Sequence, residues 1–248
     1  MKRVHIFCNW KMNPQSRVEA TVLVQKICEW PSVVLKNTVL FSPAIFLESV
    51  VRAANKKVAC GTQDVSAHAN GSYTGQISAR MAKNAGAAYT IAGHSERRLY
   101  EHDTDKIVAQ KIARAFEQKL IPVACVGETK HVSIQQSWRA VKKQLDAIIP
   151  VLQKFSNKKL FIAYEPVWAI GGHKKIAPKQ AAEMIMRIKL YMRAQTGAVP
   201  PVLYGGSVNG KSVRDLLPYI HIIDGFLIGS ASVNYKELLV IQKILYGR

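Results

Sequence analysis

Short runs of apolar, often β-branched residues recur along the chain, and segments with helical spacing lie between them. A short continuous apolar run is typical of a strand that is buried on both faces, as in a parallel sheet. Several intervening segments instead repeat apolar residues at intervals of three and four, which predicts amphipathic helices. The expected strands are 5–10, 38–42, 57–63, 89–94, 121–126, 159–165, 201–205 and 222–228, and the clearest helices are 104–119, 135–152 and 178–196.

Eight strands alternating with helices, without a linker or a low-complexity stretch, predict a single (β/α)8 barrel, with one domain over residues 1–248. A doubly wound open sheet is the alternative. It is disfavoured because no GxGxxG pattern follows the first strand, where a dinucleotide site would begin. The apolar stripe of segment 104–119 includes one charged residue, Lys111.

The composition, 48% hydrophobic and 21% charged, is that of an ordinary soluble globular protein. No apolar run reaches the roughly 18 residues of a membrane span, and polar residues interrupt the basic N-terminus before a signal-peptide core could form. Four scattered cysteines, without metal-ligand spacing, indicate buried thiols in a reducing compartment. We therefore expect a cytoplasmic protein. The cysteines are Cys8, Cys28, Cys60 and Cys125.

A net charge of +19 first suggests a nucleic-acid-binding protein. The basic residues are spread along the chain in pairs such as Lys56-Lys57 and Lys142-Lys143, with no run of five and no basic stripe interleaved with aromatic residues. This distribution favours a generally basic surface over a dedicated nucleic-acid site. A positive field would also attract a small anionic substrate.

An acidic residue ends one of the expected strands and begins an apolar segment. Glu165 follows a buried run, Pro166 ends the strand, and a short apolar lid then leads to Gly171 and Gly172. A carboxylate beneath an apolar lid is desolvated and therefore becomes a strong general base. An ordinary salt-bridged glutamate is the alternative interpretation of Glu165 alone.

In a barrel, the carboxyl ends of all eight strands converge on one mouth. Lys11 lies two residues after Asn9, so both point to the same side if the strand continues. His94 stands at a junction of strand and helix, where the helix N-terminus favours a neutral imidazole that can donate to a carbonyl oxygen. The polar or glycine positions expected at the mouth are Asn9, Lys11, Gln63, His94, Glu96, Glu128, Glu165, Ser207 and Gly229.

Glycine-rich turns follow the seventh and eighth expected strands, at 204–208 and 225–230. Such turns expose backbone amides at helix N-termini, and these two loops are where barrels commonly bind phosphate. A base, an imidazole, a cation and a phosphate site suit proton abstraction beside a carbonyl in a small phosphorylated sugar, through an enediolate. The sequence contains no paired nucleophile and base, no metal cluster and no nucleotide fingerprint.

Six ordered motifs resemble the triosephosphate isomerase family over essentially the whole chain. They lie at 9–13, 93–98, 125–129, 163–171, 204–208 and 224–227. The resemblance implies interconversion of dihydroxyacetone phosphate and glyceraldehyde 3-phosphate without a cofactor or a metal.

The resemblance also implies a role for each matching residue. It makes Glu165 the base and His94 the electrophile, with Lys11 and Asn9 as electrostatic partners. Glu96 would support Lys11, although Glu96 with Arg97 and Arg98 could instead form an ion network. The phosphate would be bound by backbone amides of Gly171, Ser207, Gly229 and Ser230, the last two also being part of the second glycine-rich turn.

The sequence departs from the family pattern at several places. The lid reads Gly-Gly-His-Lys at 171–174 instead of Gly-Thr-Gly-Lys, and the acidic stretch after Glu128 is replaced at 130–133. Ser230 replaces the second glycine after the last strand. A strand-to-helix turn favours a negative φ there, which a serine accepts without strain. The other departures are Cys8, where glycine is common, and Glu101, His102 and Asp103 after the Ser-Glu-Arg-Arg run.

The segment 64–79 resembles the loop through which the family dimerises, with Thr74 as its tip. We therefore expect a homodimer that acts on a triose phosphate and binds neither nucleic acid nor a membrane. Two alternatives remain: a basic protein on the same scaffold that binds an anionic surface or nucleic acid, and a different phosphosugar enzyme. The triad of Lys11, His94 and Glu165 disfavours the first, and the lid disfavours the second.

Overall fold

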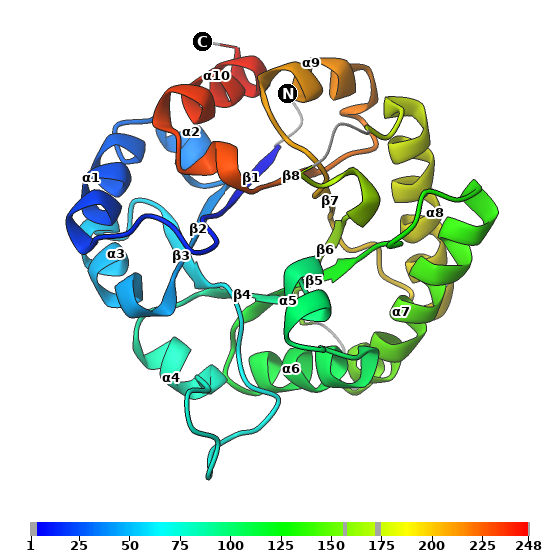
Figure 1. Ribbon diagram of the computed structural model, residues 1–248, viewed down its shortest axis with the longest axis horizontal. Coiled ribbons are helices and arrows are strands. Elements are labelled where there is room, and N and C mark those ends of the chain that lie inside the picture. Colours follow the sequence, from blue (N-terminus) through cyan, green and yellow to red (C-terminus); the bar gives the residue numbers. More distant parts are fainter. Residues whose placement is uncertain (1–3, 156–157, 172–174, 248) are drawn as a thin grey trace.

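Eight parallel strands form a closed barrel, and helices surround it (Figure 1). The computed structural model describes residues 4–155, 158–171 and 175–247. Each strand pairs with the next along the chain, and β1 pairs with β8 to close the sheet. The strands are β1 (His5–Asn9), β2 (Thr38–Ser42), β3 (Ala59–Thr62), β4 (Tyr89–Ala92), β5 (Ile121–Val126), β6 (Phe161–Tyr164), β7 (Val202–Tyr204) and β8 (Gly225–Ile228). The predicted (β/α)8 barrel is confirmed.

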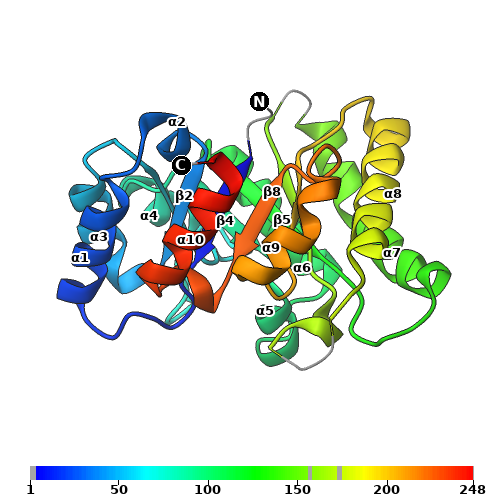
Figure 2. The same cartoon turned by 90° about the horizontal axis from the view of Figure 1, so that it is seen from above.

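Most helices form a ring outside the barrel, while the short α5 lies at one end of it, as the two views in Figures 1 and 2 show. Short 3-10 turns lie at 44–46, 167–169, 217–219 and 230–232. The helices are α1 (Arg17–Ile27), α2 (Ser32–Leu35), α3 (Leu47–Ala54), α4 (Ala79–Asn84), α5 (Ser95–Tyr100), α6 (Asp105–Glu117), α7 (Ile134–Lys154), α8 (Pro178–Thr196), α9 (Gly210–Leu216) and α10 (Tyr235–Tyr246).

The strands bury both faces, which explains their continuous apolar runs. One face fills the barrel with a cluster of its own that includes Phe7, Phe41 and Phe161, and the other packs against the helices in a larger core. The ring centroids of Phe7 and Phe161 are 4.8 Å apart. The barrel is therefore solid below its mouth, and a substrate can enter only from the strand ends.

Local signals set the helix limits that matter for the site. Ser133 and Gln136 form a capping box that begins α7. Pro178 stands in the first turn of α8, and Gly197, with φ of 73°, ends that helix in the left-handed conformation. The strands β2 and β5 have the predicted bounds, and the other six are shorter than the predicted runs by one to three residues at one or both ends.

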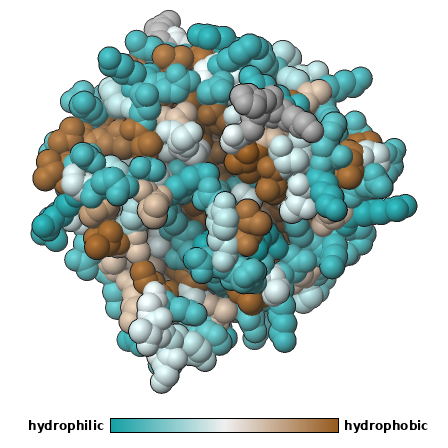
Figure 3. Space-filling view, viewed as in Figure 1, coloured by the Kyte–Doolittle hydropathy of each residue, from teal (hydrophilic) through white to brown (hydrophobic). Residues whose placement is uncertain are grey.

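No helix in the described residues is both long and apolar enough to cross a membrane. The face in Figure 3 is mostly hydrophilic, with separate hydrophobic groups among the polar side chains. All four cysteines are free.

Candidate active site

A cavity of about 480 Å³ opens at the carboxyl ends of the strands. Its wall contains every residue to which the resemblance assigns a catalytic or phosphate-binding role except Glu96. Glu96 and Gln63 lie in the wall of a second cavity of about 680 Å³, which shares Asn9, Lys11 and His94 with the first, and Glu128 lines neither cavity. The residues in the first wall that the sequence pointed to are Asn9, Lys11, His94, Glu165, Gly171, Ser207, Gly229 and Ser230.

Glu165 stands one residue beyond β6 and is only 2% exposed. Its Oε2 accepts a hydrogen bond of 3.0 Å from the backbone N–H of Ser95, in the first turn of α5. Its Oε1 lies 3.3 Å from Nε2 of His94 and has no hydrogen-bond partner among the described residues. A buried carboxylate oxygen without a partner is uncommon and is available to accept a proton.

Two glycines leave the space that Glu165 occupies. A Cβ on Gly127 would lie 1.7 Å from the carbonyl oxygen of Glu165, and a Cβ on Gly205 would lie 2.9 Å from its Cγ. Cys125 also borders this carboxylate: burial and, to a lesser extent, the charge of Glu165 raise the pKa of the thiol well above its usual range. The thiol therefore stays neutral beside the base. Gly127 and Cys125 lie in one of the motifs but were not singled out as site residues, because contacts between strands decide their role.

His94 is the N-cap residue of α5 and is 6% exposed. Its Nδ1 accepts a hydrogen bond of 3.2 Å from the backbone N–H of Glu96. In this arrangement Nδ1 carries no proton, so the ring proton is on Nε2, beside the cavity and Glu165. The tautomer agrees with the neutral imidazole expected at a helix N-terminus.

Lys11 reaches the cavity by a different route from the predicted one. The strand ends at Asn9, and Lys11 has φ of 56°, so the condition for strand alternation is not met, although both residues line the cavity. The side-chain amide of Gln63 donates to the carbonyl oxygens of Lys11 (2.8 Å) and Phe41 (3.0 Å), and the backbone N–H of Lys11 donates to Oδ1 of Asn9 (3.1 Å). These hydrogen bonds stabilise the left-handed turn at Lys11, whose side chain lines the cavity.

The Nζ of Lys11 lies 2.5 Å from Oε1 of Glu96. This ion pair is what the family resemblance implied for Glu96. A network of Glu96 with both neighbouring arginines is not what the structure contains: Arg98 pairs with Asp105 at 2.6 Å, and Arg97 pairs elsewhere.

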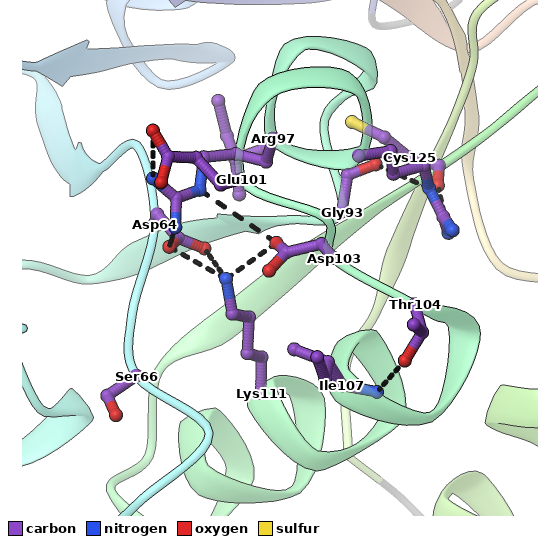
Figure 4. Close-up of polar contacts among 12 residues, drawn as sticks. Asp64, Ser66, Gly93, Arg97, Glu101, Asp103, Thr104, Ile107, Lys111 and Cys125 are labelled. Carbon is purple, nitrogen blue, oxygen red and sulfur yellow. Dashed lines mark hydrogen bonds and ion pairs between the residues drawn. The ribbon is translucent and has the colours of Figure 1, made fainter.

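Arg97 belongs to a cluster of charged side chains beside the site, of which Lys111 and Asp103 are buried (Figure 4). Lys111 is 3% exposed, and its Nζ lies 2.8 Å from both carboxylate oxygens of Asp64 and 2.6 Å from Oδ2 of Asp103. Arg97 approaches Asp64 at 3.2 Å. Burial raises the pKa of Asp64, while Lys111 and Arg97 oppose this effect and Asp103 adds to it. The cluster joins the loop after β3 to α6.

The opposite side of the cavity is formed by the loops after β7 and β8. Ser207 lies after β7, and Ser230 opens a 3-10 turn in which the hydroxyl of Ser232 donates to the carbonyl oxygen of Gly229 at 2.6 Å. The φ of Ser230 is negative, as predicted. A Cβ on Gly229 would lie 3.1 Å from Cε of Lys11. Asn234 and Glu237, which the sequence analysis did not single out, also line this side. The lid departures at 172–174 lie outside the described residues.

A metal site is a further possibility for clustered acidic and histidine side chains. In the part of the chain described, no group of three or more His, Cys, Asp or Glu residues could hold a metal ion.

Comparison with known proteins assigns the chain. The family model of triosephosphate isomerase matches residues 4–245. The triosephosphate isomerase of Herminiimonas arsenicoxydans is 35% identical, covering 97% of this chain and 98% of its own length. The enzymes of the same name from Thermus thermophilus and Delftia acidovorans are 37% and 36% identical, over 98% and 97% of this chain and 99% and 98% of their own lengths. The chain belongs to the triosephosphate isomerase family.

Proposed function

We propose that Glu165 is the general base through which this isomerase interconverts dihydroxyacetone phosphate and glyceraldehyde 3-phosphate. The observation that supports this role is the buried Oε1 of Glu165, which has no hydrogen-bond partner among the described residues, in a residue that lines the same cavity as His94 and Lys11. This oxygen removes the proton from the carbon next to the carbonyl group.

The negative charge that develops during this step lies on an oxygen of the enediolate. The Nε2–H of His94 donates a hydrogen bond to that oxygen, and the ammonium group of Lys11 stabilises its negative charge. Asn9 lies in the wall with them. The proton then returns from Glu165 to the neighbouring carbon, while the hydroxyl proton of the enediolate moves from one of its two oxygens to the other beside His94, and the two transfers complete the exchange of aldehyde and ketone. Glu96 acts through Lys11, whose ammonium group it holds.

Backbone amides of Gly171, Ser207, Gly229 and Ser230 bind the phosphate in this proposal. All four residues line the cavity, on the side formed by the loops after β6, β7 and β8. The short 3-10 turn that Ser230 opens leaves its first amides without partners inside the turn, which is a common arrangement for binding an anion.

The Glu165→Gln variant tests this function. It keeps the size of the side chain but cannot accept the carbon proton, so we expect kcat to fall by about 10³-fold or more. Affinity for a phosphate-bearing substrate analogue should change little. The measurement is a coupled assay with glyceraldehyde 3-phosphate together with analogue binding. Near-normal turnover of the variant would refute the assignment of the base.

We also propose that the chain forms a homodimer through the loop at 64–79. This loop extends away from the barrel, and its residues 68–76, with Thr74 among them, are exposed (Figure 1). Met12 and Ile45, each 84% exposed, add apolar surface on the loops after β1 and β2. The cavity of about 680 Å³ offers a receptor for such a loop beside Asn9 and Lys11.

Thr74→Arg tests the dimer, because a bulky charge at the loop tip would oppose its burial in a partner. Analytical ultracentrifugation should give a dimer for the unmodified chain and a monomer with reduced kcat for the variant. A monomeric and fully active unmodified chain would contradict the proposal.

The scattered free thiols support a place in the reducing cytoplasm.

A further inference from the structure

Arg98 lies in α5, the helix that His94 begins, and each nitrogen of its guanidinium group has an oxygen partner. Nε donates to the carbonyl oxygen of Gly93 at 2.9 Å, and Nη2 donates to that of Cys125 at 3.3 Å. Nη1 donates to Oδ1 of Asp105, in the first turn of α6, at 2.6 Å. One planar group therefore joins the carboxyl ends of β4 and β5 to the start of a helix.

The same residue also holds the next carbonyl group along the chain. The backbone N–H of Arg98 donates to the carbonyl oxygen of His94 at 3.0 Å. The carbonyl groups of Gly93 and His94 belong to the two peptide bonds that flank the Cα of His94, and each peptide bond is planar. Arg98 therefore restrains both peptide planes from which the imidazole projects, one through its side chain and the other through its backbone.

The turn before His94 depends on such contacts for a single conformation. Gly93 has φ of 71°, and a glycine leaves the backbone free to adopt many other angles. A Cβ on Gly93 would lie 2.5 Å from Cγ2 of Val108 and 3.2 Å from Nη2 of Arg98, so the turn packs closely against the guanidinium group. Releasing the Gly93 carbonyl would therefore loosen the turn at the point where it carries the imidazole.

The peptide bond after His94 also contacts the base. Its N–H is that of Ser95, which donates to Oε2 of Glu165 at 3.0 Å. A rotation of this peptide plane would therefore displace the imidazole and the hydrogen-bond donor of the carboxylate together.

We propose that Arg98 is a positioning residue for His94: its guanidinium group holds the Gly93 carbonyl and thereby aims Nε2–H at the oxygen of the enediolate. The inference rests on the proposed function, in which His94 donates to that oxygen. Arg98 is not among the described residues of the cavity wall, so it acts on the reaction only through the turn.

The expected effect is on the chemical step rather than on substrate binding. The hydrogen bond from His94 strengthens as negative charge develops on the oxygen, so a misdirected imidazole lowers kcat and leaves KM nearly unchanged. A displacement of about 1 Å at a reacting group costs up to about 10²-fold in rate. A purely structural role of Arg98 would instead lower Tm and leave the kcat of the folded protein unchanged.

The first test compares Arg98→Lys with Asp105→Asn. The lysine keeps a positive charge beside Asp105 but lacks the planar fork that reaches three oxygens, so kcat should fall about 10- to 100-fold with KM within about twofold. Asp105→Asn is the matched control, because it removes the ion pair and leaves the contacts of Arg98 with both strand ends. It should lower Tm and keep kcat within about twofold of the unmodified chain.

A double variant, Arg98→Met with Asp105→Asn, leaves neither charge of the ion pair without its partner. Compared with Asp105→Asn alone, it should lose kcat as Arg98→Lys does, because both changes release the Gly93 carbonyl. Circular dichroism and thermal unfolding would establish that each variant is folded at the assay temperature. A kcat equal to that of Asp105→Asn, or loss of folding in both Arg98 variants, would assign Arg98 a structural role and overturn the inference.

Nitrogen NMR of isotope-labelled histidines measures the imidazole itself, and His94→Gln identifies its signals among those of the seven histidines. The unmodified chain should show separate ring-nitrogen signals for His94, as expected of a fixed tautomer whose Nδ1 accepts from the N–H of Glu96. These signals should move toward the average of the two tautomers in both Arg98 variants and not in Asp105→Asn. Unchanged signals in both Arg98 variants would also overturn the inference. Failure of the proposed function would appear separately, as turnover retained in Glu165→Gln.

Discussion

At the scale of single residues, the absence of a side chain at Gly205 places the base. Because a Cβ there would lie 2.9 Å from Cγ of Glu165, Gly205→Ala should push the carboxylate away from His94. A displacement of about 1 Å at a reacting group can cost up to about 10²-fold in rate, so we expect kcat to fall about 10- to 100-fold. Steady-state kinetics with a thermal unfolding control would measure this, and unchanged kcat would contradict it.

Ser230 shows the opposite case, a side chain that replaces a family glycine without strain. Its φ is negative, so its backbone can present the same amide as a glycine. We predict that Ser230→Gly changes KM for glyceraldehyde 3-phosphate by less than about threefold. A larger rise in KM would mean that the serine hydroxyl itself binds the substrate.

At the scale of elements, the buried charge cluster links the loop after β3 to α6. Lys111→Met leaves the buried Asp103 and the half-buried Asp64 without their ammonium partner, which should lower the free energy of unfolding by about 3–5 kcal/mol. Lys142→Met, which breaks the exposed pair with Asp146, is the matched control and should cost no more than about 1 kcal/mol. Denaturant titration of both variants would show the contrast, and equal losses would contradict it.

The same variant has a predicted pH dependence. Burial already raises the pKa of Asp64, and removal of the opposing Lys111 charge would raise it further. A carboxyl group with a raised folded-state pKa binds its proton more tightly in the folded state, so its penalty grows as pH rises through that pKa. The difference in Tm between the unmodified chain and Lys111→Met should therefore be smaller at pH 5 than at pH 8.

The elements themselves could be predicted because eight apolar runs and their helical spacers are local patterns. The polar residues after those runs also pointed to the cavity, since barrel strands converge. What could not be predicted depends on contacts between distant segments: the Ser95 amide on Glu165, the turn at Lys11 that Gln63 supports, and the ring of His131 on Trp168. Lys111 is a charged residue within an apolar stripe and was therefore a local signal of a buried ion pair. No local pattern indicated which acidic residues would be its partners.

The whole molecule carries 35 basic and 16 acidic residues, which leaves a net charge of +19 around a site for a dianionic substrate. If this field steers the substrate, kcat/KM should fall several-fold as sodium chloride shortens the Debye length from about 10 Å at 0.1 M to about 3 Å at 1 M. Sulfate and phosphate salts must be avoided because they would occupy the phosphate site. Unphosphorylated glyceraldehyde is the control, since a neutral substrate should show no such dependence. Equal salt dependence for both substrates, or none for either, would show that the charge does not serve capture of the substrate.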